Sequence, residues 1–321
     1  MLHFISAYIS CLLLISCNNS HPNSNLRPNK STSNLEQTTA IMPTSNRIGY
    51  QLDQPNNRFK LSKELKEISG LVCYKDQWLA AVQDEKGAIY LLDKDNGAIL
   101  DVIEFSADGD YEGITVVKDV FYVLRADGVL FQIKHWNKKN KNISTKVIDT
   151  NLGEINDTEG LAYDPVKNQL LIACKGSASI GEKEHSFRAI YAYDLQKQKF
   201  NTNPIFTLDR KQFKHFVQDN LKQNPDYSSY KKELKKAKKS MLLAPSAIAV
   251  HPITKEFYLL SAAGNSLIVL DRKYQIKYLK RLPSDHFEQP EGLTFNSNGD
   301  LFLSSEGIKK KARIYKFDYL P

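Results

Sequence analysis

The chain has 321 residues, of which 41% are hydrophobic and 10% aromatic, and its formal net charge is +8. This length is enough for one large all-β domain or two ordinary domains. The charge does not indicate nucleic-acid binding, because most of the excess lies in one segment. Between Asp209 and Ser240 there are ten Lys or Arg against four Asp or Glu. We therefore expect no nucleic-acid partner.

The first residues, 1–16, resemble the signal peptide of a bacterial lipoprotein. They are apolar and lead into Leu14-Ile15-Ser16-Cys17, which is similar to the lipobox whose Cys is lipidated and becomes residue one. The apolar stretch is too short to span a bilayer comfortably, although a plain secretory signal or a short transmembrane helix is the alternative. We expect a lipid on Cys17 to anchor the protein to a membrane.

Residues 17–45 are rich in Asn, Ser, Thr and Pro and contain few large apolar side chains. Such a segment cannot bury enough surface to offset its ordering entropy, so we expect a flexible tether. Asn18, rather than Asp, follows Cys17, and by resemblance to bacterial sorting rules this implies the outer membrane. The expected location is the cell envelope, as an outer-membrane lipoprotein that faces the periplasm.

A short phrase recurs through residues 46–321 at a nearly regular interval. Each copy has an acidic residue, then Gly or another small residue, then a short apolar run. The copies start at Glu67, Glu112, Glu159, Ser246 and Glu291, with steps of 45, 47, 87 and 45 residues. A period of 40–50 residues is typical of β-propellers, in which each repeat forms one blade.

Each phrase opens a set of strand-like runs separated by turn residues. The first repeat has four, within residues 70–105, and Asn96-Gly97 before the last is a hairpin signal. The fifth repeat has only three runs, and an extra run, Asn57–Leu61, precedes the first phrase. We predict an all-β, five-bladed propeller closed by this N-terminal strand. A six-bladed propeller, with a degenerate blade in the 87-residue step, is the alternative.

The excess length in the long step maps to residues 209–243. Phe213, Phe216, Val217 and Leu221 lie at helical spacing there, and a Lys-rich stretch, Lys231–Lys239, follows. We predict a helical insertion within the propeller domain. Its lysines form either a solvated helix face or a contact with anionic lipid headgroups.

Cys73 and Cys174 each lie in an apolar, strand-like run. We expect buried free thiols, with a disulfide as the alternative in an oxidising compartment. Their spacing is not that of a metal site.

The phased phrases resemble those of the SdiA-regulated family, which is distantly related to NHL-repeat propellers. The most similar phrase is Asp157-Thr158-Glu159-Gly160-Leu161-Ala162-Tyr163. A second set ends the second strands, at Gln83-Asp84-Glu85, Arg125-Ala126-Asp127, Cys174-Lys175-Gly176, Ser261-Ala262-Ala263 and Ser304-Ser305-Glu306. The resemblance covers roughly Phe59–Leu320. It implies a five-bladed propeller that binds calcium at a shared site, and it implies a fold and an ion more readily than a reaction.

In a propeller, equivalent positions of the innermost strands form rings around the central channel. The candidate metal ligands near one mouth are Glu67, Glu112, Glu159 and Glu291, with Asp84 or Glu85, Asp127 and Glu306 in or beside that ring. Converging carboxylates repel one another, and either protonation or a cation relieves the repulsion. Calcium suits such a site because it takes six to eight oxygen ligands.

No His or Cys is in phase with the ring, which disfavours zinc, whereas magnesium is possible. The alternative is that each glutamate only accepts backbone N–H bonds between blades. Ser246 replaces the carboxylate in the fourth repeat, so the ring would be lopsided. Asp108-Gly109-Asp110 lacks the other ligands of a calcium loop, and we interpret it as a turn.

Arg125 and Lys175 lie where they could contact an anion in the channel, or pair with neighbouring glutamates. The sequence contains no Ser-His-Asp arrangement and no Gly-rich phosphate loop. We therefore expect a monomeric, calcium-binding module for an unidentified envelope protein or small molecule. The alternative is a calcium-dependent hydrolase, similar to a lactonase or phosphoesterase, with the ion as Lewis acid.

Overall fold

The computed structural model describes residues 48–134, 142–184, 186–236 and 243–321. The predicted signal peptide (1–16), tether (17–45) and lipidated Cys17 lie outside these residues. No helix within the described ranges is long and apolar enough to cross a membrane.

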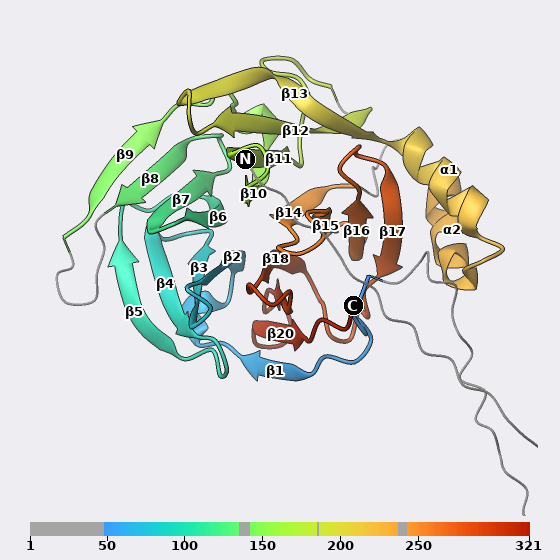
Figure 1. The fold of residues 1–321 in the computed structure, drawn as a ribbon, viewed down its shortest axis with the longest axis horizontal. Helices are drawn as coiled ribbons and strands as arrows, with labels where there is room; N and C mark the ends of the chain where they lie inside the picture. The colour runs from blue at the N-terminus through green and yellow to red at the C-terminus, as the bar shows by residue number, and fades with distance from the viewer. Residues whose placement is uncertain (1–47, 135–141, 185, 237–242) are drawn as a thin grey trace, which may run out of the picture. The chain divides into compact units, whose positions relative to one another are not determined.

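The described chain forms five four-stranded antiparallel sheets, each of which is one blade (Figure 1). Blade 1 has β2 (Ile68–Tyr74), β3 (Trp78–Gln83), β4 (Ala88–Asp93) and β5 (Ile99–Glu104). Blade 2 has β6 (Tyr111–Val117), β7 (Val120–Arg125), β8 (Leu130–Lys134) and β9 (Ser144–Ile148). Blade 3 has β10 (Thr158–Asp164), β11 (Gln169–Cys174), β12 (Phe187–Asp194) and β13 (Lys199–Asp209). Blade 4 has β14 (Pro245–Val250), β15 (Phe257–Ser261), β16 (Ser266–Leu270) and β17 (Ile276–Arg281).

Blade 5 is built from both ends of the described chain. Its strands are β18 (Pro290–Phe295), β19 (Leu301–Ser305), β20 (Arg313–Phe317) and β1 (Asn57–Lys60). β1 pairs antiparallel with β20, from Asn57 opposite Lys316 to Lys60 opposite Arg313. The inner strands β2, β6, β10, β14 and β18 contact one another in succession, and β18 returns to β2. The predicted five-bladed ring and its N-terminal closing strand are confirmed, and the six-bladed alternative is wrong.

The long step between the third and fourth phrases holds helices rather than a hidden blade. β13 leads directly into α1 (Arg210–Asn220), and α2 (Ser228–Lys236) follows. The Asp209 carboxylate caps α1 by accepting the Gln212 N–H at 2.7 Å. Phe213, Val217, Tyr227 and Tyr230 of the insertion are buried, packed with side chains of blades 3 and 4.

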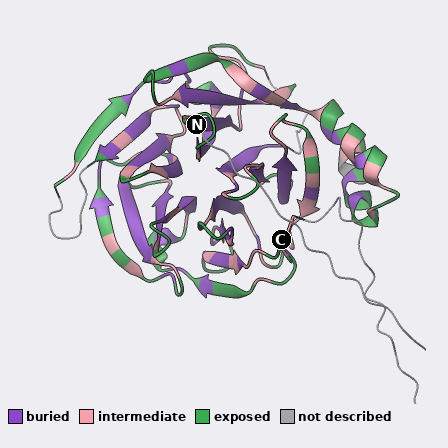
Figure 2. Ribbon diagram, viewed as in Figure 1, coloured by how far each residue is buried: buried purple, intermediate pink, exposed green. Residues whose placement is uncertain are grey.

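The core lies between neighbouring blades, and burial falls from the channel outwards (Figure 2). All five residues of β16 are buried, whereas β9 is exposed except for Ile148. A strand covered on both faces has no polar face, so the inner and middle strands are nearly continuous apolar runs. The thiols of Cys73 and Cys174 are both free, so the disulfide alternative is wrong.

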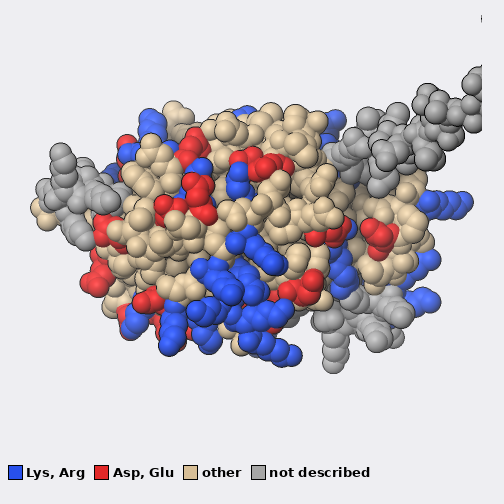
Figure 3. All heavy atoms as spheres, turned by 90° about the horizontal axis from the view of Figure 1, so that it is seen from below, with Lys and Arg blue, Asp and Glu red and all other residues tan. Residues whose placement is uncertain are grey.

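Positive charge is not confined to the helical insertion. Figure 3 shows Lys and Arg side chains gathered on the side of the molecule where β1 lies. The exposed basic residues of β1 and the segments beside it are Arg58, Lys60, Lys63, Lys309, Lys310 and Lys311. The insertion therefore accounts for only part of the basic surface.

Candidate metal centre at the acidic mouth of the channel

Each inner strand begins with a β-bulge at the repeated phrase. In blade 3, Thr158 pairs with Cys174 and Gly160 with Ala173, which leaves Glu159 unpaired between them. The same register shift occurs in the other four blades, between Ile68 and Leu71, Tyr111 and Gly113, Pro245 and Ala247, and Pro290 and Leu293. A bulge releases one residue from the ladder and re-aims its side chain, so the fold presents one residue per blade at the channel mouth.

A close approach between neighbouring backbones fixes which residues are equivalent. A Cβ added at Gly70 would lie 2.9 Å from the Glu112 carbonyl oxygen, and one at Gly113 would lie 3.0 Å from that of Glu159. A Cβ at Gly292 would lie 3.2 Å from the Ser69 carbonyl oxygen. A side chain has little room where one blade's phrase packs this tightly against the next, so four blades have Gly at this position and blade 4 has Ala247. The equivalent residues, which we call the ring, are Ser69, Glu112, Glu159, Ser246 and Glu291.

The prediction that Glu67 occupies the ring is therefore wrong. In blade 1 the acidic residue stands three positions before Gly70, whereas Glu112 and Glu159 stand immediately before their glycines. Ser69 takes the ring position instead. Glu67 belongs to a second level, two residues earlier, whose members are Glu67, Asp110, Asp157, Ala244 and Gln289. The ring thus holds three glutamates and two serines.

The residues after the second strand of each blade form a third level. The backbone N–H groups of Asp84, Ala126, Lys175 and Glu306 each donate to the second-level carbonyl of their own blade. Glu306 is thus equivalent to Asp84 and not to Glu85 or Asp127, which lie one residue further on. Glu85 is exposed, and the Asp127 carboxylate accepts two hydrogen bonds from Arg125, at 2.9 and 2.7 Å.

Burial and mutual repulsion perturb the carboxyl groups of the mouth. Glu159 and Glu291 are 3% and 4% exposed. Burial, with the charges of Glu159 and Asp110, raises the pKa of Glu112 to about 11. Burial likewise raises the pKa of Glu159 and of Glu306 to about 8 and that of Asp84 to about 6, and it also raises the pKa of Glu291. Without a cation, burial and repulsion therefore favour the protonated form of these groups, and a bound cation would favour the charged form.

Lys175 is a basic residue that contacts this cluster directly. Its Nζ lies 2.6 Å from Glu159 Oε1, an ion pair whose lysine side chain is 36% exposed. Burial lowers the pKa of Lys175, but Glu159, Asp157 and Glu291 raise it by more, so the ammonium stays charged. Both bases that we predicted as anion contacts therefore have carboxylate partners, Arg125 with Asp127 and Lys175 with Glu159.

Two buried oxygens at the mouth have no hydrogen-bond partner, Asp84 Oδ1 and Glu291 Oε2. An unpaired buried carboxylate oxygen is costly, and a cation is one group that would satisfy it. The donors are carboxylate oxygens, which is the chemistry that calcium prefers. Among the described residues, no three Asp, Glu, His or Cys side chains already converge on a point that a metal could occupy. A cation at this mouth would therefore have to draw these side chains together.

Sequence reasoning named Asp84 only as an alternative to Glu85, and it missed Asp110 and Asp157 as site residues; all three flank the glutamates at the mouth. Asp110 and Asp157 precede the ring residues by two positions, the same offset that separates Glu67 from Ser69. That offset is visible in the sequence once Ser69 is aligned with Glu112. The turn interpretation of Asp108-Gly109-Asp110 overlooked it.

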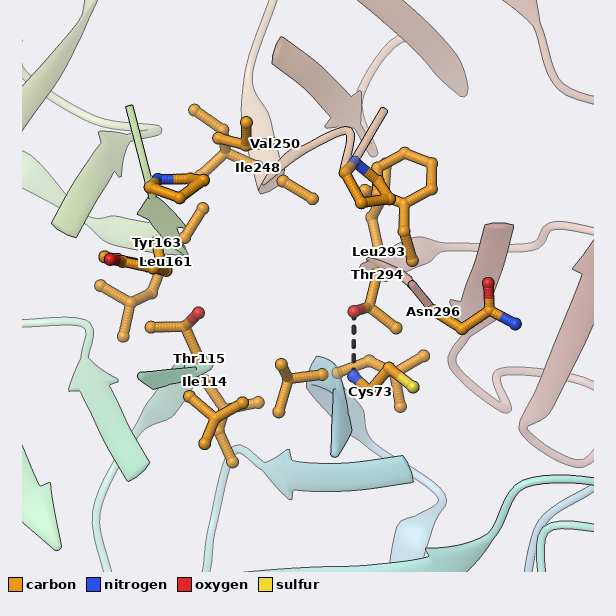
Figure 4. Close-up of a pocket in the computed structure, with 18 of the residues that line it drawn as sticks. Cys73, Ile114, Thr115, Leu161, Tyr163, Ile248, Val250, Leu293, Thr294 and Asn296 are labelled. Carbon is orange, nitrogen blue, oxygen red and sulfur yellow. Dashed lines mark hydrogen bonds between the residues drawn. The ribbon is translucent and has the colours of Figure 1, made fainter. Parts of the chain in front are cut away.

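The other end of the channel holds a neutral cavity of about 320 Å³ (Figure 4). Ile114, Thr115 and their equivalents in the other blades line it, and the Thr294 hydroxyl accepts the Cys73 N–H at 3.0 Å. One aliphatic residue per blade follows the glycine position and separates this cavity from the mouth. These residues are Leu71, Ile114, Leu161, Ile248 and Leu293, and all are buried. The glutamates of the ring therefore gather at one end of the channel, whereas Asp76 and Lys255 are among the residues that line the cavity at the other end.

Fold and site together define a five-bladed β-propeller with an acidic mouth at one end of a channel and a cavity of mixed polar and apolar lining at the other. The family model of the SdiA-regulated proteins matches residues 52–317, and the chain belongs to that family. No curated protein matches the sequence.

Several solved structures resemble this chain at low sequence identity. One is a streptogramin B lyase, with 12% identity, a TM-score of 0.42, and coverage of 82% of this chain and 97% of the other. A second is a PQQ-bound aldose sugar dehydrogenase from Streptomyces coelicolor, with 11% identity, a TM-score of 0.46, and coverage of 83% and 97%. A third is a gluconolactonase from Xanthomonas campestris, with 13% identity, a TM-score of 0.44, and coverage of 79% and 72%. At these identities the likeness concerns the fold alone.

Proposed function

We propose that this protein is a calcium-binding propeller of the cell envelope that acts as a binding module. The observation that carries the proposal is Glu291 Oε2, a buried carboxylate oxygen without a partner. It lies in a ring that also holds Glu112 and Glu159. A divalent cation would neutralise charges that otherwise oppose one another in a water-poor site.

The residues that would hold the ion are Glu112, Glu159 and Glu291, with Asp84 and Glu306 at the neighbouring level. Glu67 stands nearer the solvent, where it pairs with Lys66 at 3.0 Å. Asp127 is engaged by Arg125, and Glu85 is exposed. We therefore do not retain Glu67, Glu85 and Asp127 in the proposed ligand set. A site of adaptable carboxylates suits calcium better than magnesium, which keeps a rigid octahedral shell with several waters.

The location belongs to the same proposal. A lipid on Cys17 would hold the protein at the outer membrane, facing the periplasm, and a protein or small molecule of the envelope would bind as its partner. Lys231 and Lys235 of α2 are exposed and available to anionic headgroups, as predicted for the stretch Lys231–Lys239. Residues 237–239 of that stretch lie outside the described ranges.

A calcium-dependent hydrolase is the second candidate. A bound calcium would supply a Lewis acid, and Lys175, at 36% side-chain exposure, would be placed to orient an anionic substrate. That role requires Lys175 to leave Glu159. Because the ammonium already has a buried carboxylate partner, we favour the binding module.

Calcium binding to the full-length chain in detergent tests the proposal. We expect calorimetric titration to detect a calcium site, and chelator to lower the melting temperature, because an ion bound only by the native state stabilises it. Glu291→Gln should abolish both effects, whereas Glu85→Gln, in the exposed position, should change neither. Absence of calcium binding, together with no effect of chelator, would refute the proposal.

A further inference from the structure

One blade places a positive charge where its neighbours place negative charge or none. At the third level, blade 1 has Asp84, blade 5 has Glu306, and blades 2 and 4 have alanines. Blade 3 has Lys175 at this position. The N–H of Lys175 donates to the Asp157 carbonyl at 2.8 Å, as the N–H of Asp84 donates to that of Glu67 at 3.4 Å. The lysine therefore occupies a place from which a side chain reaches the mouth.

The ammonium lies among the carboxylates that the proposed ion would use. Lys175 Nζ is 2.6 Å from Glu159 Oε1, and the Glu159 side chain is 4% exposed. Its charge also acts on Glu291 and Glu306, which come from blade 5. Lys66, the other lysine at the mouth, pairs with Glu67 at the solvent-exposed rim, where both side chains are more than a third exposed.

An ammonium and a calcium ion cannot share Glu159 without strong repulsion. Calcium binds carboxylate oxygens at about 2.3–2.6 Å, the same range as the present contact with Nζ. Even on opposite oxygens of one carboxylate, the two cations would lie a few ångströms apart, on either side of a Glu159 side chain that is only 4% exposed. Like charges at that distance repel strongly when screening is poor.

We infer that Lys175 is a built-in competitor of the cation at this mouth. In the cation-free protein its ammonium neutralises Glu159, and the ion binds only when Lys175 gives up that contact. The inference deepens the proposed function and rests on it. Two consequences follow: the lysine weakens cation binding, and it compensates the charge of Glu159 while the mouth is empty.

Calorimetric titration of the full-length chain in detergent with calcium chloride tests the inference. Lys175→Met retains the aliphatic stem and removes the charge, and it should bind calcium at least tenfold more tightly than the wild type. Lys175→Arg retains the positive charge and should stay within about threefold of the wild type. Lys66→Met removes the same charge from the exposed pair and should change affinity less than twofold.

Melting curves in chelator show whether a variant is folded, and so separate weak folding from changed calcium binding. Lys175→Met should melt below the wild type in chelator, because Glu159 loses its partner, and calcium should restore it. If the wild type binds calcium and Lys175→Met binds no more tightly, the inference fails and the proposed function stands. If neither the wild type nor any variant binds calcium, the proposed function fails and the inference with it. Calcium binding by Lys175→Met but not by the wild type would support the inference.

Discussion

Acid should destabilise this propeller through one buried histidine, His251, which follows β14. Its side chain is fully buried. Nδ1 accepts the N–H groups of Ile253 and Thr254 at 3.2 and 3.1 Å, so its hydrogen must be on Nε2. Nε2 lies 2.8 Å from Tyr50 Oη, which in turn donates to the Gly299 carbonyl. A second proton on the ring would face two N–H donors and find no acceptor.

The size of the effect follows from the pKa. Burial lowers the pKa of His251 to about 4, from an ordinary value near 6.5. At pH values between these two pKa values, His251 is protonated in the unfolded chain and neutral in the folded chain. The free energy of unfolding therefore falls as the pH decreases from about 6.5 to about 4, by about 1.4 kcal/mol per pH unit. The total loss from this residue is about 3 kcal/mol.

Urea unfolding of the wild type and of His251→Asn, at several pH values between 7.5 and 4, measures this loss. The Asn Oδ1 can accept the same two N–H groups but does not take up a proton. The variant should be less stable than the wild type at pH 7.5, and the gap should shrink by about 3 kcal/mol as the pH falls to 4. The carboxyl groups titrate in both proteins and cancel in the difference. Parallel stability curves would refute the reasoning.

Three further predictions concern packing, a buried ion pair and the anchor. Gly113→Ala places a Cβ 2.6 Å from a leucine of the next blade and should cost about 1–3 kcal/mol in urea unfolding. Gly153→Ala, whose added Cβ meets nothing within 4 Å, should stay within about 0.5 kcal/mol of the wild type; equal losses would contradict the packing argument. The Arg272 guanidinium donates to Asp164 at 3.2 and 2.9 Å. Asp164→Ala removes this partner and should lower the free energy of unfolding by about 3–5 kcal/mol. A loss below 1 kcal/mol would show that this pair does not stabilise the fold. Cys17→Ala should release the protein from membranes in a fractionation experiment, and persistent membrane association would argue against the lipid anchor.

The blades were predictable from the sequence because the same packing contacts recur in every blade and select the same kinds of residue each time. Gly113 and Gly160 recur because neighbouring backbones approach closely at that position, and the apolar runs recur because strands are covered on both faces. The extra run Asn57–Leu61 and the missing strand at the C-terminus predicted the closure, and β1 occupies Asn57–Lys60. The insertion was predictable as well, since Phe213 and Val217 are buried at the expected helical spacing.

The composition of the mouth was less predictable, because it depends on pairing across strands. Glu67 resembles the ring glutamates by eye, yet the bulge between Ile68 and Leu71 puts Ser69 in their place. The equivalence of Glu306 with Asp84, rather than with Glu85 or Asp127, was hidden for the same reason. The hydrogen bonds to the partner strand decide which residues after a strand are equivalent. The contact of Lys175 with Glu159 requires the two strand ends to be placed in space, which spacing alone does not provide.

The closing strand also has a consequence for biosynthesis. β1 is the first strand of the domain to be made, and its partner β20 is the last. About 250 residues separate the two halves of this contact, so the ring cannot be sealed before β20 has been made. A chain that stops before Arg313 leaves β1 without a partner and exposes the edge of β19. Products truncated before β20 should therefore be open to proteases, and the ring closes only after β20 has been made.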